Sequence, residues 1–131
     1  MATAERIENP NEPRHFALLR PAPRLVEVLR AGRVLARTRA ALRLLEHGRE
    51  LYDPVLYLPA ADLEAELAER PETTHCPLKG DALYFDLLSP AGGVEAEKIA
   101  WSYPQPLGFA STLAGRVAFY ADKVTIREGD A

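Results

Sequence analysis

Hydrophobic and polar positions alternate along this chain in short runs, a pattern typical of β-strands rather than of helices. Between Ala82 and Leu88, leucine and phenylalanine occupy every second position, opposite alanine, tyrosine and aspartate. Similar runs, rich in valine, leucine or aromatic residues and bounded by glycine or proline, predict further strands. These runs are Arg24–Arg30, Arg33–Arg39, Pro54–Leu58, Val94–Tyr103, Arg116–Tyr120 and Lys123–Glu128.

Two pairs of these runs are separated by only two residues, which is the spacing of a tight antiparallel hairpin. Ala31-Gly32 separates the first pair, and its glycine suits the backbone of such a turn. Ala121-Asp122 separates the last pair. We therefore expect one hairpin over residues 24–39 and a closing hairpin over residues 116–128.

Helical patterns are rare in the sequence. Ala41–Glu46 fits either a strand or a short helix. Ala60–Glu69 predicts one helix, since Pro59 precedes it, acidic residues occupy its first turns and leucines lie four residues apart. Arg70-Pro71 would end that helix.

The first 23 residues contain four prolines and show no periodicity, so we expect an extended N-terminal arm there, with a disordered tail as the alternative. Residues 24–131 then form a single β domain. With 131 residues in total there is room for one hydrophobic core. The fold class that follows is mainly β, with six to eight short strands in two antiparallel sheets and one short helix near residues 60–69.

Composition excludes several classes of protein. At 47% hydrophobic and 27% charged residues, the chain has the composition of a globular domain. No run approaches the ~20 apolar residues that span a bilayer, and the first residues lack the apolar centre of a signal peptide. We therefore expect a cytoplasmic protein with no membrane partner. One cysteine cannot form an internal disulfide or a cysteine-rich zinc site, and we expect neither a metal nor a cofactor.

Charge is unevenly distributed, because the first 50 residues are rich in arginine and the remainder is acidic. A basic face for nucleic acid is one interpretation. The other is that the arginines are solvated and pair with the acidic half. We favour the second and expect no nucleic-acid partner, because no aromatic residues are interleaved with the arginines as a nucleic-acid platform requires.

The segment Thr74–Tyr84 is the best candidate for a functional site. Its Lys79-Gly80 pair is unusual in a chain that otherwise prefers arginine. A lysine ammonium suits point-charge anion binding or imine chemistry, and Gly80 lets backbone amides approach a ligand. A surface turn with a solvated lysine is the alternative. The glycine-rich run of a Walker loop is absent.

The same segment contains further candidates for chemistry. Cys76 would be a nucleophile if a neighbour activated its thiol, although a lone cysteine is more often a small buried hydrophobe. His75 and Asp81 are candidates for moving protons, but His75 points away from Cys76 in an extended segment. Four aromatic side chains lie in this segment or in other predicted strands, where they either fill the core or line a pocket. These are Tyr57, Tyr84, Trp101 and Tyr103.

The stretches Tyr57–Pro59, Thr74–Tyr84, Ala100–Pro104 and Val117–Tyr120 together resemble the bacterial domain-of-unknown-function family 427. The resemblance extends over roughly Leu25 to Ile126. It implies a small β fold of the β-tent type, shared in outline with methionine-R-sulfoxide reductases and the cereblon ligand domain. It also implies that the Thr-x-Cys-Pro-x-Lys-Gly segment, Tyr84, Trp101 and Tyr103 are hallmarks of the family.

Two properties associated with that resemblance do not carry over to these residues. The family has carried a nucleotidyltransferase-like label, but this chain has no Gly-Ser followed by an Asp-x-Asp metal site. The paired Cys-x-x-Cys zinc knuckles of many β-tent proteins are also missing from the sequence. Neither the activity nor the metal is therefore expected here.

Three functions remain. The first, which we favour, is binding of a small anionic or carbonyl-containing ligand by Lys79 and Gly80 in a pocket walled by Tyr57, Tyr84, Trp101 and Tyr103. The second is a transferase or hydrolase in that pocket, in which Lys79 or Cys76 reacts and His75 or Asp81 moves protons. The third is a protein-interaction module that uses a strand edge or the arginine-rich hairpin. The sequence leaves the oligomeric state open.

Overall fold

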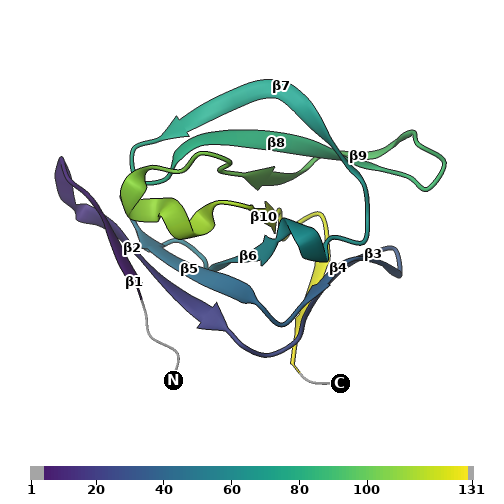
Figure 1. Ribbon diagram of the computed structural model, residues 1–131, viewed down its shortest axis with the longest axis horizontal. Helices are drawn as coiled ribbons and strands as arrows, with labels where there is room; N and C mark the ends of the chain where they lie inside the picture. Colours follow the sequence, from purple (N-terminus) through teal and green to yellow (C-terminus); the bar gives the residue numbers. More distant parts are fainter. Residues whose placement is uncertain (1–4, 130–131) are drawn as a thin grey trace.

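The computed structural model describes residues 5–129, and most of these are β-strands in two antiparallel sheets (Figure 1). The larger sheet has eight strands. In spatial order they are β1 (Glu5–Asn9), β2 (Glu12–Ala22), β5 (Ala41–His47), β6 (Val55–Pro59), β10 (Arg116–Phe119), β9 (Val94–Ser102), β8 (Gly80–Leu88) and β7 (Leu67–Cys76). The smaller sheet has the order β11 (Thr125–Glu128), β3 (Val26–Arg30) and β4 (Arg33–Thr38). The prediction of a mainly β fold with two antiparallel sheets is confirmed, with eleven described strands instead of six to eight.

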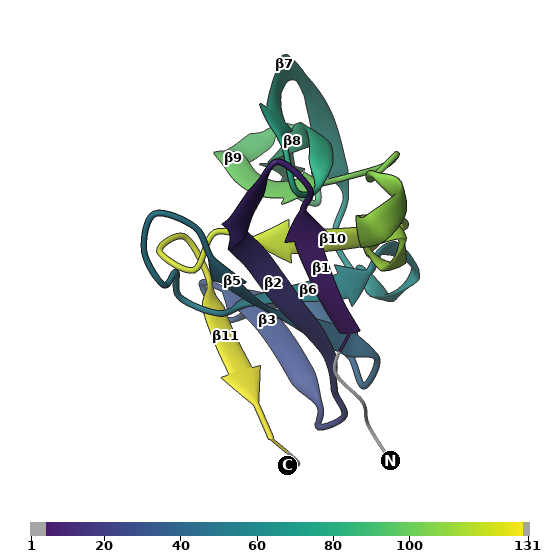
Figure 2. The same ribbon diagram turned by 90° about the vertical axis from the view of Figure 1, so that its left-hand side faces the viewer.

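The large sheet curls into a half-barrel, and its two faces pack against different partners (Figures 1 and 2). Side chains alternate between the faces, so that neighbours such as Tyr57 and Leu58 belong to separate hydrophobic clusters. Leu58 joins the cluster that the small sheet covers, together with Val28 and Leu35. Tyr57 joins a second cluster on the concave face of the half-barrel.

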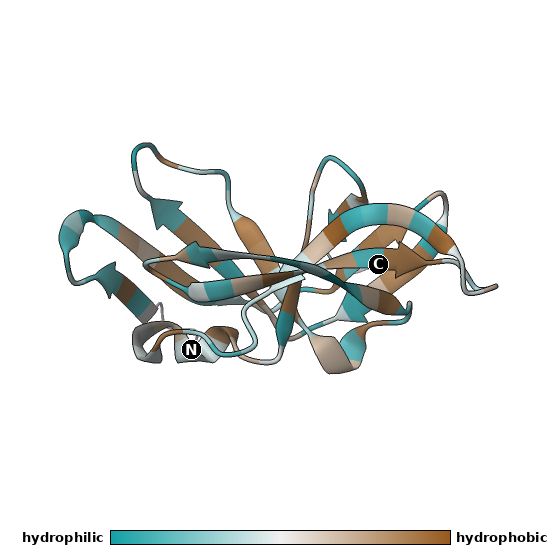
Figure 3. Ribbon diagram, turned by 90° about the horizontal axis from the view of Figure 1, so that it is seen from above, coloured by the Kyte–Doolittle hydropathy of each residue, from teal (hydrophilic) through white to brown (hydrophobic). Residues whose placement is uncertain are grey.

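The concave face is partly filled by the 3-10 segment η2 (Gly108–Leu113). Its buried Ala110 and Leu113 share one cluster with Ile7 from β1 and Leu78 from the turn after β7. The first strand of the sheet and the turn joining its last two strands are therefore connected through this segment. Figure 3 shows hydrophobic residues along the strands and hydrophilic residues at many of the turns, as expected for sheets that bury their faces.

The first predicted hairpin is confirmed. Strands β3 and β4 pair around Ala31 and Gly32, whose φ angles are 50° and 78°. Positive φ at both turn positions is the geometry that matches the twist of a tight hairpin. The run Ala41–Glu46, for which both a strand and a helix were possible, lies in strand β5 (Ala41–His47).

The predicted helix over Ala60–Glu69 is wrong. Only η1 (Ala60–Asp62) is helical, and β7 begins at Leu67. The amide of Glu64 donates to the carbonyl of Leu35 at 2.8 Å, and Leu67 pairs with Leu87 of β8. Pairing with other strands thus overrides the spacing of the leucines, and Pro71 is tolerated because β7 is an edge strand.

The predicted closing hairpin is also wrong. Strand β10 lies between β6 and β9, so both of its edges are already paired. The chain therefore turns away after Tyr120, where the amide of Lys123 donates to the Tyr120 carbonyl at 2.9 Å. Strand β11 then pairs with β3 in the small sheet.

The N-terminal part, for which the sequence predicts an extended arm over residues 1–23, is extended from Glu5 onward. It forms β1 and β2, which pair with each other, and β2 also pairs with β5 (Figure 2). Residues 1–4 lie outside the described part of the chain. Within residues 5–129 the helical segments are short 3-10 turns, and none is long and apolar enough to cross a membrane.

Candidate functional site

Three ionisable side chains meet at the concave face of the half-barrel, although they come from distant parts of the chain. The Lys79 ammonium donates to Glu46 Oε1 at 2.6 Å, and His15 Nε2 lies 2.9 Å from Glu46 Oε2. Only 11% of the Lys79 side chain, 14% of Glu46 and 16% of His15 is exposed. We call this linked set the Lys79–Glu46–His15 array.

The pairing of β2 with β5 positions His15 and Glu46. Ala17 of β2 lies opposite Glu46 of β5, so His15 falls near Glu46 on the same face of the sheet. Along β2, His15 also precedes Ala17 and Leu19 at two-residue spacing, and both of these residues are buried. The array therefore continues a hydrophobic face with polar groups.

The turn between β7 and β8 positions Lys79. Cys76 pairs with Gly80, the amide of Lys79 donates to the Cys76 carbonyl at 3.2 Å, and Leu78 is fully buried. The amide of Leu107 donates to the Lys79 carbonyl at 3.1 Å, which attaches the turn to the segment before η2. The Lys79 amide is thus used within the turn, and the ammonium is directed inward.

Electrostatics keep both partners of the ion pair charged. Burial lowers the pKa of Lys79, but Tyr57, Tyr103 and the Glu46 carboxylate outweigh it and raise this pKa above its ordinary value. Burial raises the pKa of Glu46, but Lys79 and His15 outweigh it and lower this pKa. A charged, paired ammonium is a weak nucleophile, because imine formation requires a free amine. It also offers no unbalanced positive charge to a ligand.

The predicted neighbourhood of Lys79 and the aromatic residues is found. Lys79 Nζ lies 5.5 Å from the centroid of the Tyr103 ring, which is 6.4 Å from the Tyr57 ring centroid. Trp101 Nε1 donates to the Tyr57 hydroxyl at 3.2 Å, and the two rings meet edge-on. Tyr57 and Tyr103 are buried, so they form the floor of the site, whereas Trp101 is only partly buried. These contacts form one aromatic cluster.

Tyr84 lies beside this cluster. It pairs with Trp101 across β8 and β9 and is partly buried. Its hydroxyl lies 2.6 Å from Thr74 Oγ1, and Lys98 Nζ lies 4.6 Å from its ring centroid. Tyr84 is therefore part of the periphery of the cluster and does not contact Lys79 through any of these interactions.

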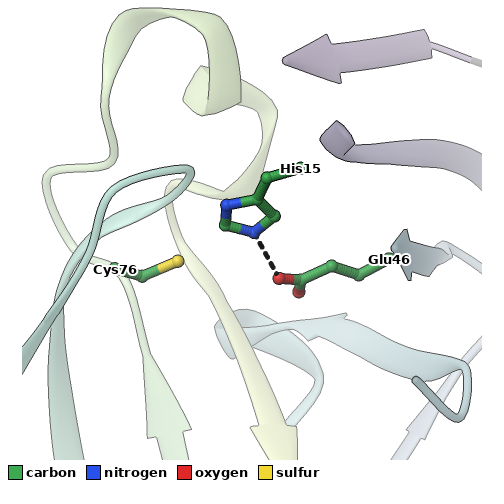
Figure 4. Close-up of side chains that lie close together, drawn as sticks. All are labelled: His15, Glu46 and Cys76. Carbon is green, nitrogen blue, oxygen red and sulfur yellow. Dashed lines mark hydrogen bonds and ion pairs between the residues drawn. The ribbon is translucent and has the colours of Figure 1, made fainter. Parts of the chain in front are cut away.

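The structure separates Cys76 from the proton-moving residues that the sequence suggested. His75 and Asp81 contact each other at 2.8 Å, with 62% and 77% of their side chains exposed. Cys76 is partly buried and belongs to the concave cluster. Figure 4 shows its sulfur facing His15 and Glu46 across the hollow, and one ligating atom from each of the three lies within 4.8 Å of the others.

A cavity of about 860 Å³ opens beside the array. It is lined by Glu12, Arg14, His15, Glu46, His47, Gly48, Arg49, Tyr52 and Val55. Arg14 is bound to Glu12, and the charge of Glu46 is balanced by Lys79. Among the described side chains that line the cavity, Arg49 therefore contributes a positive charge without an ion-pair partner.

The sequence interpretation missed His15 and Glu46 as site residues. A signal was present for Glu46, because it follows Leu42 and Leu44 at two-residue spacing and places a charge on an apolar face of the strand. A charge in such a position is retained only when it is paired. Its partner was not identifiable, because Lys79 lies 33 positions away and reaches it only through the fold.

A family model described as Domain of unknown function (DUF427) matches residues 18–129. The chain belongs to this family, as the resemblance in its sequence indicated. The matched range contains Glu46, Cys76 and Lys79, whereas His15 lies just before it. Comparison with curated proteins finds no match.

Proposed function

We propose that this member of the DUF427 family is a binding domain for a small anionic molecule, held in the cavity beside the Lys79–Glu46–His15 array. The carrying observation is that two mostly buried ionisable side chains, His15 and Glu46, line a cavity large enough for a small metabolite, and that buried Lys79 pairs with Glu46. Burying charges costs free energy that pairing only partly returns, so such an array is weak evidence for a role in stability. Perturbed ionisable groups beside a cavity point instead to a functional site.

The charge of the lining supports an anionic ligand. The two carboxylates in the cavity lining are both neutralised, Glu12 by Arg14 and Glu46 by Lys79. Arg49 adds a guanidinium that can bind a carboxylate or phosphate in a bidentate manner. Lys79 then acts indirectly, because it cancels the charge of Glu46 and so prevents repulsion of the anion.

The rest of the site supports recognition by shape. Val55 lines the cavity and also packs against the hydrophobic cluster of the concave face, which contains Tyr57 and Tyr103, so the cavity borders the apolar floor of that face. A half-barrel with a small sheet on its outer face agrees with the β-tent type that the family resemblance implies. The sheet then supplies a rigid floor for the binding cavity, and the segment between β5 and β6 supplies the polar contacts to the ligand.

The proposal is tested by titrating the full chain with inorganic phosphate and with succinate at constant ionic strength, followed by amide NMR. We expect saturable shifts in residues 46–52, with affinity reduced about tenfold or more in Arg49→Gln, because a charge-assisted bidentate contact is lost. Arg20→Gln is the matched control, since Arg20 is an exposed arginine of β2 outside the cavity lining. Equal loss in both variants, or no saturable shift for either anion, would overturn the proposal.

A further inference from the structure

We propose that His15, Glu46 and Cys76 form a binding site for a divalent transition-metal ion, and that zinc is the ion that their chemistry fits best. An imidazole nitrogen, a carboxylate oxygen and a thiol sulfur converge from three separate segments, with their ligating atoms within 4.8 Å of one another (Figure 4). Within the described residues, these three are the set of histidine, cysteine or acidic side chains whose ligating atoms lie close enough together to hold a metal ion. The proposal does not depend on the binding of a small organic anion.

The geometry needs only a small adjustment to hold zinc. Zinc–ligand bonds of about 2.0–2.3 Å place the ligand atoms of a tetrahedral site roughly 3.5 Å apart. His15 Nε2 and Glu46 Oε2 are already 2.9 Å apart. A rotation of the Cys76 side chain, which is only partly buried, can bring its sulfur closer.

The donor set selects the metal. Calcium and magnesium prefer oxygen ligands, so a site with a thiolate and an imidazole disfavours them. Three protein ligands leave the fourth position of tetrahedral zinc open, as in sites that bind water or substrate. A single cysteine excludes cysteine-rich zinc knuckles but is sufficient for this mixed site.

Neighbouring residues orient two of the ligands. Lys79 holds Glu46 Oε1, which leaves Oε2 for the metal. His15 Nδ1 lies 3.3 Å from the side-chain Nδ2 of Asn9, and Asn9 Oδ1 accepts a hydrogen bond from the backbone amide of Asn11. In this arrangement Asn9 donates to Nδ1, and His15 Nε2 carries the proton that faces Glu46.

Metal binding therefore changes two proton positions. The Cys76 thiol loses its proton to solvent, and the His15 proton moves from Nε2 to Nδ1, so that sulfur and Nε2 can each donate an electron pair to zinc. The Nδ1–H of His15 then needs an acceptor, which Asn9 does not provide because its side-chain NH2 group faces Nδ1. Replacing Asn9 with aspartate would supply one and create a carboxylate–histidine–metal relay.

The test is titration of the full, chelator-treated chain with zinc by calorimetry, and with cobalt(II) by absorption spectroscopy. We expect one ion per chain, release of about one proton at neutral pH, and a thiolate-to-cobalt charge-transfer band with the visible spectrum of a tetrahedral site. Cys76→Ser should abolish that band, and His15→Gln should weaken zinc binding at least ~10-fold. Asn9→Asp should tighten zinc binding by about tenfold.

The matched control is His75→Gln, which removes an exposed histidine outside the concave face. It should leave zinc affinity unchanged, and circular dichroism of each variant checks that the fold is retained. Absence of stoichiometric binding to the wild-type chain would overturn the proposal, as would cobalt spectra unaltered by Cys76→Ser or affinity lost in His75→Gln. Arg49→Gln should retain zinc binding, which separates this test from that of the anion site.

Discussion

At the scale of single residues, Glu46 links the other groups of the site. Its two oxygens contact Lys79 and His15, and its side chain borders the cavity. Removing one partner of a buried ion pair leaves an uncompensated charge, which costs more than the pair itself contributes. Substitutions at Glu46 should therefore reduce stability and ligand binding together.

The lowered pKa of Glu46 makes a prediction for acid stability. The ordinary pKa of a glutamate is 4.5, and the folded chain holds Glu46 below this value. The unfolded chain therefore binds a proton at Glu46 more readily than the folded chain does. The stabilisation of the fold by the ionised Glu46 carboxylate is present above pH 4.5 and is lost as the pH falls through the folded-state pKa. Urea unfolding at a series of pH values should show the difference in stability between wild type and Glu46→Gln shrinking below this pH. A difference that stays constant with pH would contradict the prediction.

At the scale of elements, the turn between β7 and β8 is the part that the sequence could identify best. The Lys79-Gly80 pair marked it, and the structure shows why Gly80 is needed. Its φ is 109°, and an added Cβ would lie 3.3 Å from the Leu107 nitrogen and 3.4 Å from the Gln105 carbonyl oxygen. Glycine thus allows both the turn and the close approach of the segment before η2.

Gly80→Ala should therefore destabilise the fold by about 2 kcal/mol, because alanine is strained at positive φ and would meet backbone atoms that cannot move freely. Denaturant unfolding measures this change. Gly93→Ala is the matched control, since nothing lies within 4 Å of the added Cβ there, and it should be close to neutral. Equal stability of the two variants would show that the turn is not constrained as described.

Local pattern predicted most strands, and the two predictions that are wrong, the helix and the closing hairpin, have the same physical origin. The leucines at positions 63 and 67 have helical spacing, but each pairs with another strand in the fold. Strands β10 and β11 are close in sequence, but β10 has no free edge. In both cases strand partners distant in sequence decide the structure, and the local sequence pattern does not identify these partners.

At the scale of the whole molecule, the curvature of the large sheet builds the site. It brings the turn after β7 to the face formed by β2 and β5, so that Lys79 reaches Glu46. The sequence could predict that Lys79 and the aromatic residues lie together, because they occur in neighbouring strands. It could not predict His15 or the cavity, since these depend on the register of β2 against β5.

The same long-range pairing accounts for part of the uneven charge. Arg33 binds Glu95 at 2.8 Å and Arg43 binds Glu128, so arginines of the first half meet acidic residues of the second. Other arginines pair locally, as Arg37 does with Glu27. The interpretation of the arginines as solvated groups that partly neutralise the acidic half agrees with these contacts, although each exposed pair contributes little stability.

The central claim is that folding brings the β7–β8 turn to β5 and forms a buried ion pair there, and a double-mutant cycle tests it most directly. Denaturant unfolding at pH 7 of wild type, Glu46→Gln, Lys79→Met and the double variant gives the four free energies. Each single variant should lose roughly 3 kcal/mol, because it leaves the partner charged and buried. The double variant should lose less than the sum of both losses, by at least ~1 kcal/mol. If the two losses simply add, Lys79 and Glu46 do not interact in the folded chain, and the site described for this concave face does not exist.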